Sequence, residues 1–123
     1  MSNEKFGGEQ NVVLTKSFAF AVRMVKLNKH LRSTHQEYVL SKQLVRCGTS
    51  IGANVEEAIG GISKADFSAK ISIAYKEARE TSYWLRLLNE AEYLDSKLFH
   101  SLHSDCEELC KILFSILRTT GRA

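Results

Sequence analysis

Apolar residues recur every three or four positions along most of this chain, which is the spacing of one face of an α-helix. We expect helices over residues 11–32 and 37–59, then from a cap at Ser63 to Ala91, and from a cap at Asp95 to Thr119. No stretch shows the alternation of a strand bounded by turn residues. The pattern predicts an all-α fold, an antiparallel up-down-up-down four-helix bundle.

Residues that favour helix ends mark these boundaries. Asn11, Ser63 and Asp95 are of the types preferred at helix N-termini, and Gly60-Gly61 follows the predicted end of the second helix. The chain contains no proline, which favours long, uninterrupted helices. Residues 1–10 are polar and are predicted to be disordered, which leaves a single domain over residues 11–120.

The first helix carries two apolar faces instead of one. Their centres are about 130° apart around the helix axis, whereas a helix in an isolated bundle usually needs a single stripe. We therefore expect a second packing partner, either a neighbouring helix or another subunit. The first face consists of Leu14, Phe18, Ala21, Val22 and Val25, and the second of Val13, Phe20, Met24, Leu27 and Leu31.

The second helix contains residues that helices disfavour, above all Gly48 and Gly52. A glycine in a helix interior costs roughly 1 kcal/mol relative to alanine, so two of them suggest that another segment approaches this backbone closely. The remaining helices have ordinary apolar stripes. The core faces expected for the last three helices are Leu40, Leu44, Cys47, Gly48, Ile51, Val55 and Ala58; then Phe67, Ile71, Ala74, Ala78, Leu85 and Leu88; then Leu98, Leu102, Leu109, Leu113 and Ile116, with Phe99, Cys106, Cys110 and Leu117 beside them.

The second helix also has a polar stripe, whose members fall within about 80° of one another. We interpret it as structural, with Arg46, Glu57 and Glu80 in hydrogen-bonded pairs that fix helix register or subunit contacts. An enzyme that uses Glu57, Glu77 and Glu80 is the alternative, and it requires a pocket with perturbed carboxylates. The residues of the structural stripe or interface are Gln43, Arg46, Ser50, Asn54, Glu57 and Glu80.

The sequence offers little for metal or nucleophilic chemistry. A di-iron bundle requires Glu-x-x-His motifs, and His100 and His103 have no matching carboxylates. The three cysteines are interpreted as structural thiols. We therefore expect no catalytic residue, no metal, no cofactor and no small-molecule substrate.

Positive charge is concentrated in the first part of a chain whose net charge is +3. Between residues 11 and 46 the only acid is Glu37. Basic side chains along a helix can follow nucleic-acid phosphates, although a solvated helix face explains the same pattern. A symmetric oligomer would repeat the charge and sum its field. The nucleic-acid-binding hypothesis rests on Lys16, Arg23, Lys26, Lys29, Arg32 and Lys42.

One segment resembles a known family signature. Gln43-Leu44-x-Arg46-x3-Ser50-Ile51-x2-Asn54-Val55-x-Glu57 is similar to the pattern of the proteins encoded by intervening sequences in bacterial 23S ribosomal RNA genes. A second block, with Phe67, Ile73-Ala74, Glu80 and Leu85, matches as well, so that the resemblance covers residues 14–117. Ala58 and Lys76-Glu77 depart from it, where the family often has Gly and Gly-Ser.

The resemblance implies an up-down bundle that assembles as a homopentamer around a central channel. Most members have no assigned activity. A related branch, the accessory proteins of diversity-generating retroelements, works with a reverse transcriptase and binds nucleic acid through a basic surface.

Three functions remain open. The first is a non-enzymatic oligomeric bundle that binds RNA or DNA; the second is a protein-interaction scaffold without nucleic acid; the third is the carboxylate enzyme. No apolar run approaches the ~20 residues of a membrane span, and the N-terminus has no hydrophobic signal region. The expected location is the cytoplasm.

Overall fold

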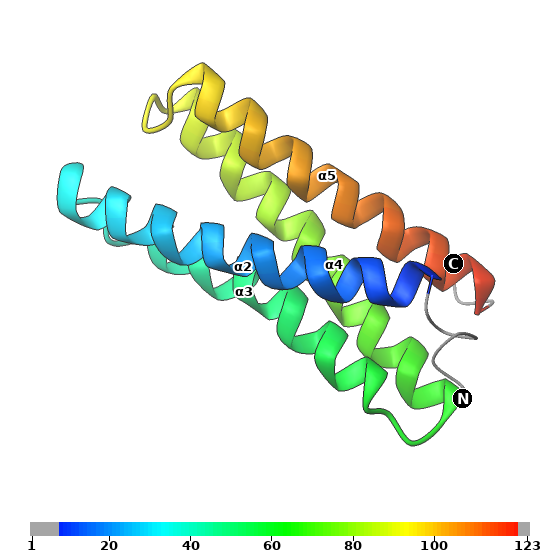
Figure 1. The fold of residues 1–123 in the computed structure, drawn as a ribbon. Helices are drawn as coiled ribbons and strands as arrows, with labels where there is room; N and C mark the ends of the chain where they lie inside the picture. Colours follow the sequence, from blue (N-terminus) through cyan, green and yellow to red (C-terminus); the bar gives the residue numbers. More distant parts are fainter. Residues whose placement is uncertain (1–7, 121–123) are drawn as a thin grey trace.

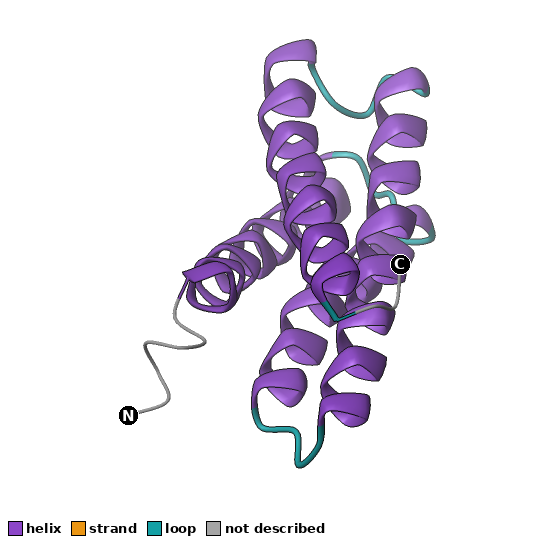
Figure 2. Cartoon of the chain, turned by 90° about the vertical axis from the view of Figure 1, so that its right-hand side faces the viewer, coloured by secondary structure: helices purple, strands orange, loops and turns teal. Residues whose placement is uncertain are grey.

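The computed structural model describes residues 8–120, which form four helices joined by short loops (Figures 1 and 2). The helices are α2 (Gly8–Thr34), α3 (Leu40–Ile59), α4 (Lys64–Glu90) and α5 (Ser96–Thr119). Each helix packs on its neighbours in sequence, and α2 also packs on α5. The α2–α3 and α4–α5 connections lie at one end of the bundle and the α3–α4 connection at the other (Figure 1). The predicted up-down-up-down bundle is confirmed.

The core is built from the apolar faces that the sequence predicts, one from each helix. On α2, the face that contains Phe20, Met24 and Leu31 is buried, whereas Phe18 and Val25 of the other face are exposed. The first helix therefore does carry two apolar faces, and the fold of a single chain covers only one of them. None of the helices within residues 8–120 is long and apolar enough to cross a membrane.

Gly48 and Gly52 of α3 are the positions at which α2 comes closest. A Cβ atom added at Gly48 would lie 2.4 Å from Cγ of Met24, and one added at Gly52 would lie 3.2 Å from the backbone carbonyl oxygen of Ser17. A methyl group at Gly48 therefore collides with the side chain of Met24, and one at Gly52 makes a tight contact with the backbone of α2. The predicted close approach is confirmed, and its partner is the first helix.

The second helix begins later than the sequence suggests, at Leu40 instead of Glu37. The carboxylate of Glu37 accepts hydrogen bonds from the backbone amides of Val39, Leu40 and Ser41, at 3.1, 2.9 and 2.6 Å. Glu37 thus caps α3 from the preceding loop, because the first amides of a helix lack partners within it. Gln36 precedes this cap with a positive φ of 49°, which turns the chain between α2 and α3.

The environment of Glu37 stabilises its ionised form. Only 9% of the residue is exposed, and this burial by itself raises the pKa of the carboxyl group. The three backbone amides and the hydroxyl of Ser41 act in the opposite direction and together outweigh it, so that the pKa of Glu37 lies below its ordinary value.

The other helix ends agree with the sequence within a few residues. Ser63 caps α4 by accepting a hydrogen bond from the amide of Asp66 (3.0 Å), and Asp95 caps α5 by accepting one from the amide of Leu98 (2.8 Å). The first helix begins at Gly8, three residues before Asn11. Residues 8–10 are therefore helical, since Glu9 and Gln10 are good helix formers; the rest of the predicted disordered segment lies outside the described residues.

We expect Gly48→Ala to lower the free energy of unfolding by up to about 2 kcal/mol, because overpacking costs about 1–3 kcal/mol and alanine restores about 1 kcal/mol of helix propensity. In a Met24→Ala background the collision is gone, and the same substitution should be neutral or stabilising by up to about 1 kcal/mol. Urea unfolding of the four proteins at one concentration measures this coupling. A stabilising Gly48→Ala in the wild-type background would contradict the packing.

Glu37→Gln should lower the free energy of unfolding at pH 7 by about 1–3 kcal/mol, the size of a lost hydrogen bond to a charged group. Because the folded-state pKa lies below the ordinary 4.5, this contribution is fully present above pH 4.5 and is lost as the pH falls through the folded value. The difference between wild type and variant should therefore shrink at acid pH. Glu90→Gln, on the exposed end of α4, is the matched control and should have little effect; a pH-independent difference would refute the assignment.

Candidate functional site

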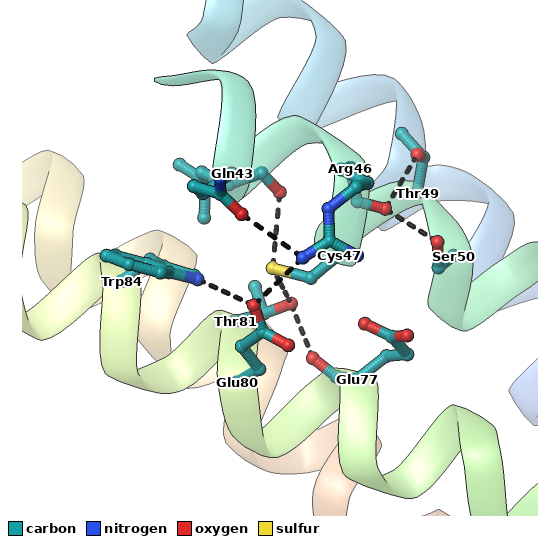
Figure 3. Close-up of polar contacts among 10 residues, drawn as sticks. Gln43, Arg46, Cys47, Thr49, Ser50, Glu77, Glu80, Thr81 and Trp84 are labelled. Carbon is teal, nitrogen blue, oxygen red and sulfur yellow. Dashed lines mark hydrogen bonds and ion pairs between the residues drawn. The ribbon is translucent and has the colours of Figure 1, made fainter. Parts of the chain in front are cut away.

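The polar stripe of α3 faces α4 and is linked to it through Arg46 (Figure 3). The Arg46 guanidinium donates to Oε1 of Gln43 and to Oε2 of Glu80, both at 3.2 Å. The indole N–H of Trp84 donates to the same oxygen of Glu80 at 3.0 Å. The Arg46 side chain is 55% exposed, and an ion pair of this kind contributes only about 0–1 kcal/mol. The network fixes how α3 and α4 align more than it stabilises the bundle.

The remaining stripe residues have separate partners. The Ser50 hydroxyl donates to the carbonyl oxygen of Arg46 at 2.7 Å, and the Asn54 amide donates to the carbonyl oxygen of Ser50 at 2.8 Å. Glu57 forms an ion pair with Lys70 of α4 at 2.8 Å. Ser50 and Asn54 thus bond within their own helix, and the stripe contacts α4 near Arg46 and again near Glu57.

The three carboxylates of the enzyme hypothesis do not converge on a common site. Glu80 is bonded to Arg46 and Trp84, and Glu57 to Lys70. Glu77 has a buried oxygen, Oε1, that accepts no hydrogen bond from any described residue. None of the three lines the groove between α2 and α3 or the depression beside Tyr83. The arrangement offers no pair of carboxylates around a space for a substrate.

The three cysteines are buried, and Cys47 is unsuited to nucleophilic chemistry. Sγ of Cys47 lies 3.2 Å from the hydroxyl of Thr81 on α4 (Figure 3). Burial raises the pKa of Cys47 to about 11, so that the thiolate, the reactive form, is scarce at neutral pH. Within residues 8–120 no group of three or more His, Cys, Asp or Glu side chains is placed to hold a metal ion.

One polar cluster was not predicted from the sequence. The hydroxyl of Ser82 on α4 lies 3.0 Å from Nε2 of His103 and 3.1 Å from Oε2 of Glu107, both on α5. A catalytic relay requires the carboxylate on the other ring nitrogen, where it orients the imidazole. Here the carboxylate approaches the same nitrogen as the serine, at 3.5 Å. The cluster is therefore a contact between α4 and α5 and no relay.

The predicted basic residues fall into two groups. Lys16 pairs with Glu108 of α5 at 3.4 Å, and Arg23 pairs with Asp105 of α5 at 2.6 Å. These two cations hold α2 against α5, and the neighbouring acids offset their charge. The other four form no ion pair within residues 8–120 and lie on the last turns of α2 and the first turn of α3. We call Lys26, Lys29, Arg32 and Lys42 the basic end.

The uncovered apolar face of α2 is the second conspicuous surface. Phe18 is 67% exposed, and Val22 and Val25 are exposed as well; we call these three residues the outer stripe. Beside the stripe, α2 and α3 enclose a groove of about 290 Å³. The groove is lined by Leu14, Ser17, Phe18, Ala21, Thr49, Gly52, Ala53 and Glu56.

The outer stripe and three residues of the basic end, Lys29, Arg32 and Lys42, belong to one face of the α2–α3 pair. Val25, Lys29 and Arg32 follow one another at the i, i+4, i+7 spacing of a single helical face, and Lys42 and Thr49 are likewise seven residues apart on α3. This face is therefore apolar along the groove and becomes basic toward the α2–α3 connection.

Comparison with known proteins agrees with this architecture. The model of the 23S rRNA-intervening sequence protein family matches residues 9–115. The crystal structure of a protein of unknown function from the S23 ribosomal protein family of Bacteroides thetaiotaomicron VPI-5482 is 49% identical and superimposes with a TM-score of 0.88, covering 89% of this chain and 98% of that one. Neither description names an enzymatic activity. No curated protein matches the chain.

The family match extends over all four helices, and its residues include the polar stripe, the outer stripe and the basic end. The resemblance drawn from Gln43–Glu57 is thereby confirmed: this chain belongs to the 23S rRNA-intervening sequence protein family.

Proposed function

We propose that this protein is a self-associating helical bundle that binds RNA or DNA through its basic end and catalyses no reaction. The observation that carries the proposal is the division among the cations of α2. Lys16 and Arg23 are paired with α5, whereas the basic end has no acidic partner within residues 8–120. Unpaired surface cations are available to phosphates, and each contact releases counterions from the nucleic acid.

The positions of the acids support this assignment. Glu37 is the only acidic residue in the α2–α3 connection, and its carboxylate is buried against the amides of α3. It therefore points inward and does not offset the charge of the basic end at the surface. The family description refers to 23S rRNA and that of the solved relative to ribosomal proteins, which makes RNA the first ligand to examine.

The outer stripe supports self-association. Apolar side chains that are exposed together beside a groove mark an interaction site on a soluble protein. A second copy is the partner we propose, in the homopentamer that the family resemblance implies. Such an assembly brings five basic ends onto one particle, and the summed field strengthens the attraction for a polyanion.

A scaffold that binds a different protein is the second candidate, because the same outer stripe is open to another apolar partner. The two candidates differ in the state of the purified protein. A self-associating protein is an oligomer when purified, with its outer stripe covered by a second copy. A scaffold is a monomer when purified, with its outer stripe exposed until the partner is added. The carboxylate enzyme is not supported, because Glu57, Glu77 and Glu80 line neither the groove between α2 and α3 nor the depression beside Tyr83.

We expect multi-angle light scattering to give a mass five times that of the 13.9 kDa chain. Phe18→Asp places a charge in the proposed interface and should shift the mass toward the monomer. Phe114→Asp, at an exposed aromatic residue on α5, is the matched control and should leave the mass unchanged. Circular dichroism checks that both variants remain helical. A wild-type monomer would overturn the self-association.

Nucleic-acid binding should weaken as salt is added, with a linear dependence of log K on log salt concentration. Lys29→Gln/Lys42→Gln should weaken binding and lower the slope by about 0.7–0.9 for each phosphate that is no longer neutralised. Lys16→Gln/Lys70→Gln removes the same charge from lysines that already pair with Glu108 and Glu57, so we expect a smaller effect. Fluorescence anisotropy with a labelled oligonucleotide measures both. Absence of binding by the wild type at low salt would refute the proposal.

A further inference from the structure

Two apolar side chains are exposed at the turn between α2 and α3, next to the basic end. Tyr38 is 50% exposed and Val39 is 72% exposed. They lie between Arg32, near the end of α2, and Lys42, in the first turn of α3. Exposed apolar side chains that lie together often mark the binding site of another molecule. A ligand for this turn has to offer both an apolar face and negative charge.

The turn holds these side chains in a fixed position. Glu37, the residue before Tyr38, is buried and accepts hydrogen bonds from three backbone amides of the following residues, including that of Val39. On the other side, the amides of His35 and Glu37 both donate to the carbonyl oxygen of Leu31, at 3.2 and 3.0 Å. Because the backbone on both sides is bonded, Tyr38 is presented without further ordering, which lowers the entropic cost of binding.

The ring of Tyr38 already interacts with a cation. The guanidinium carbon of Arg32 lies 5.0 Å from the ring centroid, within the range of a cation–π contact. This contact holds a positive charge beside an exposed aromatic ring. An unpaired nucleotide matches the pair, because its base has a flat face for the ring and its phosphate carries the negative charge that Arg32 attracts.

A double helix does not offer this combination. Its base faces are stacked on one another, and only the base edges and the phosphates are accessible, so that a duplex meets the cations and offers Tyr38 no base face. In a single strand the base faces are accessible, and stacking on aromatic side chains is how proteins bind such strands without regard to sequence.

We propose that Tyr38 is a stacking platform for an unpaired base, so that the basic end selects single-stranded RNA or DNA over duplex. Lys29 and Lys42 contact the phosphates, Arg32 holds the ring and adds charge, and Val39 extends the apolar surface. This selectivity rests on the proposed nucleic-acid binding, and it adds the form of nucleic acid that is bound.

The test compares a labelled single-stranded oligonucleotide with a duplex of the same length by fluorescence anisotropy at low salt. The wild type should bind the single strand more tightly. Tyr38→Ala should weaken single-strand binding about tenfold, since one base–aromatic stack contributes about 1–3 kcal/mol and 1.4 kcal/mol is tenfold. Duplex binding should not change, and Tyr38→Phe should retain the single-strand affinity because the ring is kept.

Tyr83 of α4 provides a matched control. It is 49% exposed and also has an arginine, Arg86, near its ring at 6.0 Å, but it lies outside the α2–α3 turn. Tyr83→Ala should leave the affinity for both forms unchanged. An equal loss in Tyr38→Ala and Tyr83→Ala would show a general effect of removing surface tyrosines and would overturn the assignment.

The remaining outcomes separate the inference from the proposed function. Equal binding of single strand and duplex, unaffected by Tyr38→Ala, would overturn the stacking platform and leave nucleic-acid binding intact. No binding of either form would refute the proposed function itself. Binding to vesicles that contain phosphatidylserine, lost in Tyr38→Ala, together with no binding to oligonucleotides, would assign the turn to an anionic membrane surface instead.

Discussion

The contact of α2 with α3 through Gly48 and Gly52 determines how the first helix is oriented. Because the backbone of α2 lies against Gly52 and Met24 lies over Gly48, α2 cannot rotate about its own axis without a collision. This orientation decides which of its two apolar faces enters the core. It also places Phe18 and the groove on the outside and directs Lys16 and Arg23 toward α5. The outer stripe, the groove and the pairing of α2 with α5 therefore all depend on two missing side chains in α3.

The same constraint divides the positive charge of the chain into two parts with different roles. Cations on the edge of α2 that faces α5 meet Asp105 and Glu108 and hold helices together. Cations beyond that edge meet no acid within the described residues and keep their charge for other molecules. The number of basic residues in the sequence does not distinguish these two groups. The packing of α2 pairs Lys16 and Arg23 with acids of α5 and leaves the basic end exposed to solvent.

Periodicity was sufficient to predict the fold, because apolar spacing indicates how many helices exist and which face of α3, α4 and α5 is buried; for α2 it gave two faces and did not show which one enters the core. The glycines likewise indicated a close contact, and the structure shows that a side chain, Met24, lies against Gly48 and the backbone of Ser17 against Gly52. The predicted start of α3 was wrong by three residues. Glu37 caps the helix through its buried side chain, whereas glutamate is more common inside a helix than at its N-cap. The pairs Lys16–Glu108 and Ser82–His103 could not be predicted, because periodicity does not show which polar faces of different helices meet.

The seam between α2 and α5 differs in kind from the other seams of the bundle. Helix α2 packs less extensively on α5 than on α3, and Arg23 and Lys16 bridge this seam at the surface. Dissolved ions screen such pairs much more than they affect buried apolar contacts. Opening of the bundle should therefore begin between α2 and α5, with α2 remaining packed on α3 and α5 on α4. We therefore expect a change in ionic strength to affect the contact between α2 and α5 more than the other helix contacts.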